Sequence, residues 1–172
     1  MSENRNTPRQ KVTKLAQELV VERIYNAPRE LVFEAWSRPE YLARWWSPKG
    51  WTLPICRLDF RPGGTWHYQM LGPNGEESWG RAVYQEIVRP ERIVFADAFS
   101  DAEGNVNAKM PQALITVELA EHEGGATRQT SRSRYESPDM LDKVLEMGMV
   151  DGMTLSMNQL DELLEALQAE RR

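Results

Sequence analysis

The chain has 172 residues, with 21 basic and 26 acidic side chains and a net charge of −5 at neutral pH. A chain of this length forms one domain by default and buries about 70% of the surface that its unfolded state exposes. The acidic balance argues against nucleic acid as the main partner, because nucleic-acid binding normally requires a basic face. No apolar run approaches the ~20 residues that a membrane span needs, so we expect none.

The N-terminus and the cysteine content indicate a cytoplasmic protein. Residues 1–14 are polar and lack the apolar core of a secretory signal peptide, and we expect them to form a disordered lead-in. Cys56 is the single cysteine, which excludes an intramolecular disulfide and fits a reducing compartment. Residues 15–172 are expected to form a single domain.

The chain begins with one predicted strand and two short predicted helices. The strand lies within residues 16–25, and both of its faces carry apolar side chains, so the alternation does not assign its inward face. Helical spacing then predicts short helices over residues 28–36 and 39–46. These helices carry Trp36, Trp45 and Trp46, which either close one end of the domain or form a mouth there.

Six further strands are predicted to follow almost without interruption. Period-2 alternation places them over residues 52–61, 65–70, 77–88, 92–99, 113–119 and 127–135. Tight turns rich in glycine and proline separate several of them, as at residues 62–64 and 72–75. Hairpin spacing of this kind predicts an antiparallel sheet of about seven strands.

A long helix is predicted over residues 138–169, with Ser137 as its N-cap and Pro138 in its first turn. Unbroken, it would be about 48 Å long. Its apolar face shifts by about a third of a turn across Gly148–Gly152, which predicts a kink or a close approach to the backbone there. The methionines around these glycines form either soft core packing or an adaptable pocket wall.

The overall expectation is an α+β fold in which a curved sheet surrounds the long helix and leaves a cavity between them. Alternation on the strands and the glycine–methionine segment of the helix supply the candidate ligand-binding residues. They are Trp66, Tyr68, Met70, Trp79, Arg81, Phe95, Asp97, Phe99, Gln129, Ser131, Ser133, Met147, Gly148, Met149 and Gly152.

Two polar features stand out among these candidates. Arg81 and Asp97 share faces with large apolar residues, so they either pair across the cavity, hold a polar ligand, or point to solvent. On the last strand Gln129, Ser131 and Ser133 occupy one face, which indicates bound water or a ligand with hydrogen-bonding groups. The alternative for that strand is an edge position, where its arginines would discourage edge pairing.

Recognised motifs of catalysis and of metal binding do not occur in the sequence. His67 and His122 are far apart, and the sequence has no cluster of histidine, cysteine and carboxylates with metal-ligand spacing. Cys56 falls in an apolar alternation and is expected to be a buried small hydrophobe. We therefore expect no metal and no cofactor, and we assign no catalytic residue.

Several motifs occur in an order that resembles a known family. They are residues 26–36 with Pro39, Glu40, Leu42, Trp45 and Trp46; residues 59–64 with Trp66; residues 84–88 with 90–93; residues 124–128; and Gly148, Met149 and Gly152. The chain resembles the activator of heat-shock protein 90 ATPase homologue family over about residues 16–168. The resemblance implies the helix-grip fold of the START-like (SRPBCC) superfamily, in which a sheet grips a C-terminal helix over a hydrophobic cavity.

Three functions are compatible with this fold. The first is binding of a small amphipathic or aromatic molecule in the cavity. The second is an interaction module that acts on a chaperone ATPase through its outer surface, which rests on the resemblance alone. The third is a cyclase-like or hydrolase-like enzyme that uses Arg81, Asp97 and a tyrosine such as Tyr68 or Tyr135 for acid–base chemistry. The polar face of the last strand departs from the aliphatic family pattern and argues against a purely lipid-like ligand.

Overall fold

The computed structural model describes residues 9–171. Its elements in chain order are β1 (Gln10–Leu15), β2 (Glu18–Tyr25), α1 (Arg29–Ser37), α2 (Pro39–Trp45), β3 (Thr52–Leu58), β4 (Thr65–Leu71), β5 (Glu77–Val88), β6 (Arg92–Ser100), β7 (Gln112–His122), β8 (Ala126–Tyr135), α3 (Pro138–Glu146) and α4 (Met149–Glu170). A single 3-10 turn, Glu123–Gly125, connects β7 to β8.

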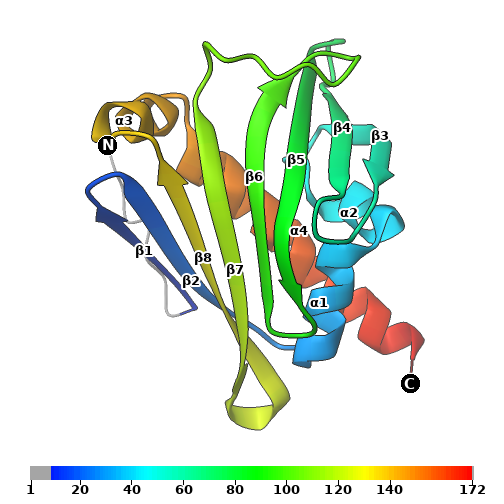
Figure 1. Cartoon of the computed structure of the whole chain (residues 1–172). Coiled ribbons are helices and arrows are strands. Elements are labelled where there is room, and N and C mark those ends of the chain that lie inside the picture. Colours follow the sequence, from blue (N-terminus) through cyan, green and yellow to red (C-terminus); the bar gives the residue numbers. More distant parts are fainter. Residues whose placement is uncertain (1–8, 172) are drawn as a thin grey trace.

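The strands form one antiparallel sheet of eight strands in the order β1-β2-β8-β7-β6-β5-β4-β3. Figure 1 shows the sheet curving around α4, which crosses behind it, while α1 and α2 lie next to α4 beside the β3 and β4 end. The second strand, β2, and the last strand, β8, are neighbours, so the last strand joins the N-terminal β1–β2 pair to the rest of the sheet. The predicted α+β helix-grip architecture is confirmed.

The expected count of seven strands is wrong by one, and the extra strand is β1. Gln10 lies opposite Arg23 and Leu15 opposite Glu18, so residues 10–15 pair with β2 along their whole length. The disordered lead-in is therefore wrong for residues 10–14, while residues 1–8 lie outside the described part of the chain. β1 contains only two apolar side chains, and backbone pairing to a buried neighbour stabilises such an edge strand more than its own side chains do.

The predicted long C-terminal helix is two helices. Gly148 adopts a left-handed conformation with φ of 87°, which ends one helix and begins the next between α3 and α4. Glycine has no Cβ and reaches this conformation without steric cost. The break confirms the predicted kink, and it places the kink at Gly148, since Gly152 lies within α4. Ser137 caps α3 as predicted, because its side chain accepts a hydrogen bond from the amide of Met140.

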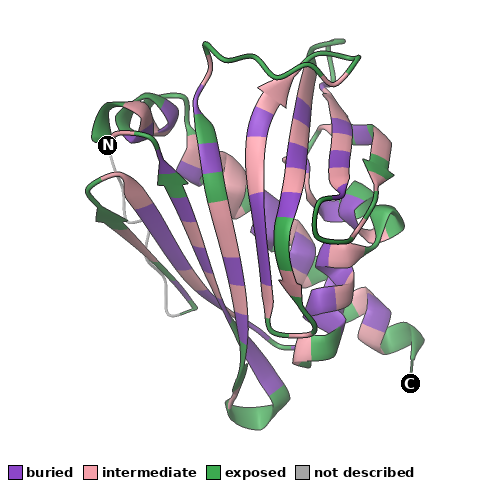
Figure 2. Ribbon diagram, viewed as in Figure 1, coloured by how far each residue is buried: buried purple, intermediate pink, exposed green. Residues whose placement is uncertain are grey.

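Alternation along the strands separates a buried inner face from a more exposed outer face, as Figure 2 shows by its bands of colour. The inner face packs against α1, α2 and α4 and forms one core. Its centre is aromatic: the rings of Trp36 and Trp45 lie 4.7 Å apart, and those of Trp46 and Trp66 lie 4.8 Å apart. Edge-to-face aromatic pairs of this kind are favourable beyond the area that they bury.

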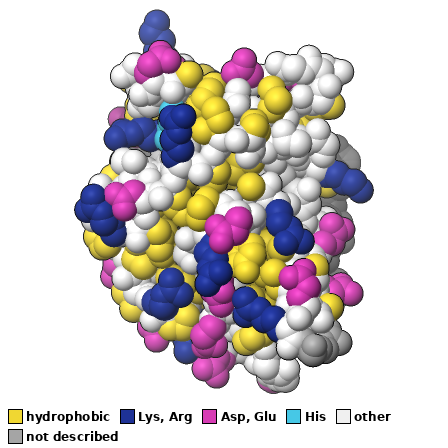
Figure 3. Space-filling model, turned by 90° about the vertical axis from the view of Figure 1, so that its right-hand side faces the viewer, with side chains coloured by type: hydrophobic (Ala, Val, Ile, Leu, Met, Phe, Trp, Pro, Cys, Tyr) yellow, Lys and Arg dark blue, Asp and Glu magenta, His cyan; other side chains and the backbone are white. Residues whose placement is uncertain are grey.

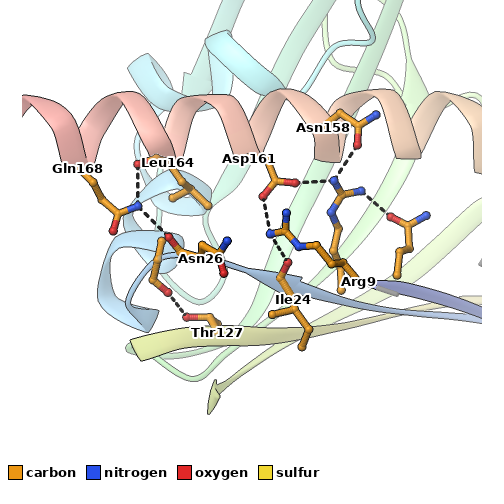
Figure 4. Close-up of polar contacts among 11 residues, drawn as sticks. Arg9, Ile24, Asn26, Thr127, Asn158, Asp161, Leu164 and Gln168 are labelled. Carbon is orange, nitrogen blue, oxygen red and sulfur yellow. Dashed lines mark hydrogen bonds and ion pairs between the residues drawn. The ribbon is translucent and has the colours of Figure 1, made fainter. Parts of the chain in front are cut away.

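Polar contacts fasten β2 to α4 (Figure 4). The buried guanidinium of Arg23 donates to Asn158 at 2.7 Å and to Asp161 at 2.6 Å on α4, and to Gln10 of β1 at 2.6 Å. Arg9 adds a contact of 3.4 Å to the same Asp161. Because Arg23 points at α4, the inward face of β2, which the sequence left open, carries Leu19, Val21, Arg23 and Tyr25. We call the contacts of Arg23 with residues 10, 158 and 161 the arginine clasp.

The outer surface carries charges of both signs. On the face shown in Figure 3, acidic and basic side chains alternate, with apolar atoms between them and no field of a single sign. Among residues 9–171, no helix is long and apolar enough to cross a membrane.

Candidate functional site

A cavity of about 350 Å³ lies between the inner face of the sheet and the helices. Its aromatic walls come from the region of α1 and α2 (Trp36, Trp45 and Trp46) and from β4 and β8 (Tyr68 and Tyr135). Its helical wall comes from the junction of α3 with α4 and from the first turns of α4 (Met147, Gly148, Met149, Gly152, Met153 and Met157). The methionine-rich segment is thus a cavity wall and not only core packing.

Asp97 lies on the inner face of β6 and lines this cavity. Its direct neighbours across the sheet are Ala82 on β5 and Ala113 on β7. Both neighbours are small, and Ala113 lines the cavity, so the space beside the carboxyl group on the β7 side is open. The hydroxyl of Tyr68, two strands away on β4, donates a hydrogen bond of 3.1 Å to Oδ1 of Asp97.

Gly80 makes this hydrogen bond sterically feasible. It lies on β5 directly opposite Tyr68 and between β4 and β6, so the tyrosine ring crosses over it to reach Asp97. A Cβ at Gly80 would lie 2.3 Å from Cζ and from the hydroxyl oxygen of Tyr68. No side chain fits there unless the ring moves, and the glycine therefore determines where the phenol can point.

The environment of Asp97 favours its neutral form. Burial raises the pKa of the carboxyl to about 7, although hydrogen bonds from the Tyr68 hydroxyl and the Ala98 amide act in the opposite direction. No cationic side chain among residues 9–171 contributes to this shift. Asp97 is half-buried because its side chain lines the cavity.

The pKa values of the tyrosines around Asp97 are also raised. Burial raises the pKa of Tyr68 above its ordinary value, and the nearby carboxylate raises it further. The pKa of Tyr135 is raised by the same two causes. Both phenols therefore stay protonated at neutral pH, as hydrogen-bond donors. The hydroxyl of Tyr135 donates to the sulfur of Met149 at 3.5 Å, which joins β8 to the start of α4.

The polar face predicted for β8 is directed inward. Gln129, Ser131 and Ser133 are at most 7% exposed. Gln129 has protein partners: it accepts a hydrogen bond of 2.8 Å from the Trp36 indole and donates one of 3.3 Å to Ser131. Ser133 lines the cavity and makes no side-chain hydrogen bond within residues 9–171. Its hydroxyl is therefore available to a molecule in the cavity.

One end of the cavity reaches the surface at the junction of α3 and α4. Met147 lines the cavity and is 54% exposed, although its side chain is large and apolar. The left-handed turn at Gly148 places this methionine at the rim by ending α3 there. The junction is accordingly the place where the cavity meets solvent.

Most of the residues predicted to form the cavity do line it. They are Tyr68, Met70, Trp79, Asp97, Phe99, Ser131, Ser133, Met147, Gly148, Met149 and Gly152. Trp66, Phe95 and Gln129 face inward but lie behind the wall, where they are nearly fully buried among other side chains. Trp79 borders the cavity at its edge, while its ring stacks on His67 with centroids 5.0 Å apart.

Arg81 does not line the cavity, and of the three alternatives left open for it the pairing with Asp97 is excluded. It lies opposite His67 on β4 and Ala98 on β6, whereas Asp97 lies opposite Ala82. Directly opposed residues of an antiparallel sheet share a face, so Arg81 points away from Asp97. The alternation on β5 was identified correctly, but its inner set is Gly80, Ala82 and Tyr84 and not the set with the larger side chains.

Other lining residues were not among the candidates, and Trp46, Gly80, Met153 and Met157 are examples. The methionines continue the spacing of Met149 along α4, so helical periodicity would have identified them. Gly80 carries no such signal, because its role depends on a ring from a neighbouring strand. Among the described residues, no group of three histidine, cysteine or acidic side chains is placed to hold a metal ion.

Comparison with known structures shows the same architecture in bacterial proteins. A crystal structure of a Mycobacterium smegmatis protein is 30% identical with a TM-score of 0.83, covering 91% of this chain and 97% of that chain. A solution structure of an Arthrobacter aurescens protein is 31% identical with a TM-score of 0.82, covering 91% of each chain. A crystal structure of a Nitrosomonas europaea protein is 28% identical with a TM-score of 0.77, covering 89% of this chain and 97% of that chain.

A search among curated proteins finds no match. The model of the family described as Activator of Hsp90 ATPase homolog 1-like protein matches residues 26–165. That match includes both short helices, β3 to β8 and most of α4, and so all the elements that surround the cavity. The chain therefore belongs to the Activator of Hsp90 ATPase homolog 1-like protein family, with the START-like helix-grip fold.

Proposed function

We propose that this protein binds a small amphipathic or aromatic molecule in the cavity between its sheet and α4. The observation that carries the proposal is the cavity itself, at about 350 Å³. Small-molecule sites usually measure about 300–1,000 Å³ and have mostly apolar walls with a few oriented polar groups. Rings and thioethers supply the apolar walls here, and Asp97 and Ser133 supply the polar groups.

The test fills the cavity without removing any of its polar groups. Gly152 lines the cavity from α4, and a Cβ built there meets no atom within 4 Å. A Gly152→Phe variant is expected to place its ring in the cavity. Gly152→Ala is the matched control, since it adds one methyl group and improves helix propensity by about 1 kcal/mol.

The readout is the intrinsic fluorescence of Trp36, Trp45 and Trp46, which all line the cavity. Phenylalkyl compounds with neutral, cationic and anionic ends serve as probes, and mass spectrometry of the purified protein searches for a co-purifying molecule. Saturable binding to wild type and Gly152→Ala, and its loss in Gly152→Phe, would support the proposal. Equal binding to all three proteins would place the ligand elsewhere and refute it.

A second candidate function is proton transfer to or from the bound molecule. The specific observation in its favour is the pKa of Asp97, about 7, on the cavity wall, because a general acid or base works best with a pKa near the operating pH. Turnover of a neutral bound probe should then be lost in Asp97→Asn while its affinity is retained. A rate that Asp97→Asn leaves unchanged would remove Asp97 from such a mechanism.

A further inference from the structure

The described residues that line the cavity include an acidic side chain and no basic one. Of the side chains of residues 9–171 that line it, only the Asp97 carboxyl can ionise near neutral pH, and no lysine, arginine or histidine is among them. Asp97 also forms no ion pair with any side chain of residues 9–171. A carboxyl group that is buried without a cationic partner is costly to ionise, so a bound cation would stabilise the ionised form of Asp97.

The walls around Asp97 also favour a cation. The rings of Trp46 and Tyr68 are edge-to-face with centroids 6.0 Å apart, and both residues line the cavity. Ring faces attract ammonium groups most strongly when the site excludes water. Methionine sulfurs of the helical wall add polarisable contacts and no positive charge. A carboxylic anion would meet no compensating charge in the same cavity.

We propose that the molecule bound in the cavity is an organic cation, an aromatic or amphipathic amine whose ammonium group forms an ion pair with Asp97. This inference rests on the proposed function and names its ligand class. The Tyr68 hydroxyl, held over Gly80, orients the carboxylate from distances of 3.1 Å to Oδ1 and 3.5 Å to Oδ2, and each oxygen retains a lone pair for the ligand. On the β7 side, the small side chain of Ala113, which lines the cavity, leaves room for the ammonium group beside the carboxylate.

Ser133 meets a different part of the ligand. On the inner face of β8 it is the position next to Tyr135, which stands across β7 from Asp97. The backbones of Asp97 and Tyr135 are therefore two strand spacings apart, about 10 Å. The free hydroxyl of Ser133 can bind a polar group at a distance from the ammonium, so an amine with a second hydrogen-bonding group fits best.

The proposal predicts how binding depends on pH. Without ligand, Asp97 is largely protonated below neutral pH, and it must lose its proton to pair with an ammonium group. Affinity for an amine should therefore rise with pH between about 6 and 8, by up to about tenfold per unit below the pKa. The titratable groups that face Asp97 are Tyr68, Tyr84 and Tyr135, from β4, β5 and β8, and burial keeps all three neutral in this range. The lining residues of α1 to α4 contribute no titratable group.

The experiment compares 4-phenylbutylamine with 4-phenylbutanol and 4-phenylbutyrate, three probes of one shape and different charge. Tryptophan fluorescence measures their affinity for wild type and Asp97→Asn at pH 6 and pH 8. At pH 8 the amine is expected to bind wild type at least about tenfold more tightly than the alcohol, because a hydrogen bond to a charged group is worth this much. Asp97→Asn should abolish that preference and leave the affinity for the alcohol within about twofold.

Each outcome separates this inference from the proposed function. Equal affinity for amine and alcohol, or a preference for the carboxylate, refutes the cationic ligand and leaves cavity binding in place. Absence of binding by all three probes refutes both. The pH profile of the wild type tests the same claim without any substitution: an amine affinity that does not change between pH 6 and pH 8 would overturn it.

Discussion

The hydroxyl of Tyr68 on β4 donates to Oδ1 of Asp97 on β6 at 3.1 Å, although β5 lies between the two strands. The contact crosses the one position of β5 that has no side chain, Gly80. It sets the direction of the one carboxyl that the described part of the chain contributes to the cavity wall. Several measurable properties of the protein follow from this arrangement.

Removal of the Tyr68 hydroxyl should raise the pKa of Asp97 further. The hydrogen bond stabilises the ionised carboxylate, and its loss in Tyr68→Phe leaves burial as the main influence. The expected pKa therefore lies above 7, and NMR titration of the Asp97 carboxyl carbon measures it. Tyr84→Phe is the control, because Tyr84 is a buried neighbour without a hydrogen bond to Asp97. A pKa that falls in Tyr68→Phe would contradict the assigned direction of the hydrogen bond.

Gly80→Ala should destabilise the protein through a steric clash. Its Cβ would meet the Tyr68 ring at 2.3 Å. Overpacking of a core typically costs about 1–3 kcal/mol, and we expect a loss in this range by urea denaturation. The double variant Gly80→Ala with Tyr68→Ala should lose less free energy of unfolding than the sum of the two single losses. The reason is that Tyr68→Ala removes the ring with which the methyl group introduced by Gly80→Ala would clash. Additive losses would show that the clash is not with Tyr68.

Asp97 should make the protein more stable in acid than its charge content suggests. Its pKa is 3.8 in the unfolded chain and about 7 in the folded protein, so the folded state binds the extra proton between these values. The contribution of Asp97 to the free energy of unfolding is therefore complete below pH 3.8. It is lost as pH rises toward 7, with a slope of at most about 1.4 kcal/mol per pH unit.

Other groups also titrate in this range, so the measurement is a difference. The free energy of unfolding of wild type minus that of Asp97→Asn should decrease between pH 5 and pH 7. A difference that is flat with pH would mean that Asp97 ionises normally in the folded protein.

The arginine clasp should contribute strongly to stability. Arg23 and Asp161 have side chains 9% and 26% exposed, and Asp161→Ala would leave the buried guanidinium without its carboxylate. Losing one partner of a buried ion pair costs about 3–5 kcal/mol, and partial exposure of Asp161 reduces this to about 2 kcal/mol here. Asp142→Ala breaks the exposed Lys14–Asp142 pair and is the matched control, with an expected change below about 1 kcal/mol. Similar losses in both variants would contradict a special role for the clasp.

Much of the fold was predictable because its elements carry strong local patterns. The inward face of β8, with Ser131 and Ser133, followed from period-2 alternation and was directed as predicted. β1 was missed since its stability comes from pairing with β2, a contact that local alternation does not encode. The helix break at Gly148 was visible as a shift of the apolar face.

The site was harder to predict for two physical reasons. Alternation gives the two faces of a strand but does not say which face is inward, and on β5 the larger residues, including Arg81, point outward. The inner face of β5 is small because the Tyr68 ring crosses over it, and only the sheet order reveals that crossing. The near-neutral pKa of Asp97 likewise depends on burial by distant segments.

The interruption at Gly148 separates two C-terminal helices that are attached to the rest of the fold in different ways. α4 is anchored along its length, by Ser156 and Gln159 to the turn after α2 and by the arginine clasp to β2. α3 packs mainly on β8, β2 and α4 and ends at the exposed Met147. Under the proposed function, the stability of the protein and the rate of ligand exchange are therefore separable properties. We expect substitutions in α3 to change that exchange rate while the contacts of α4 preserve the free energy of unfolding.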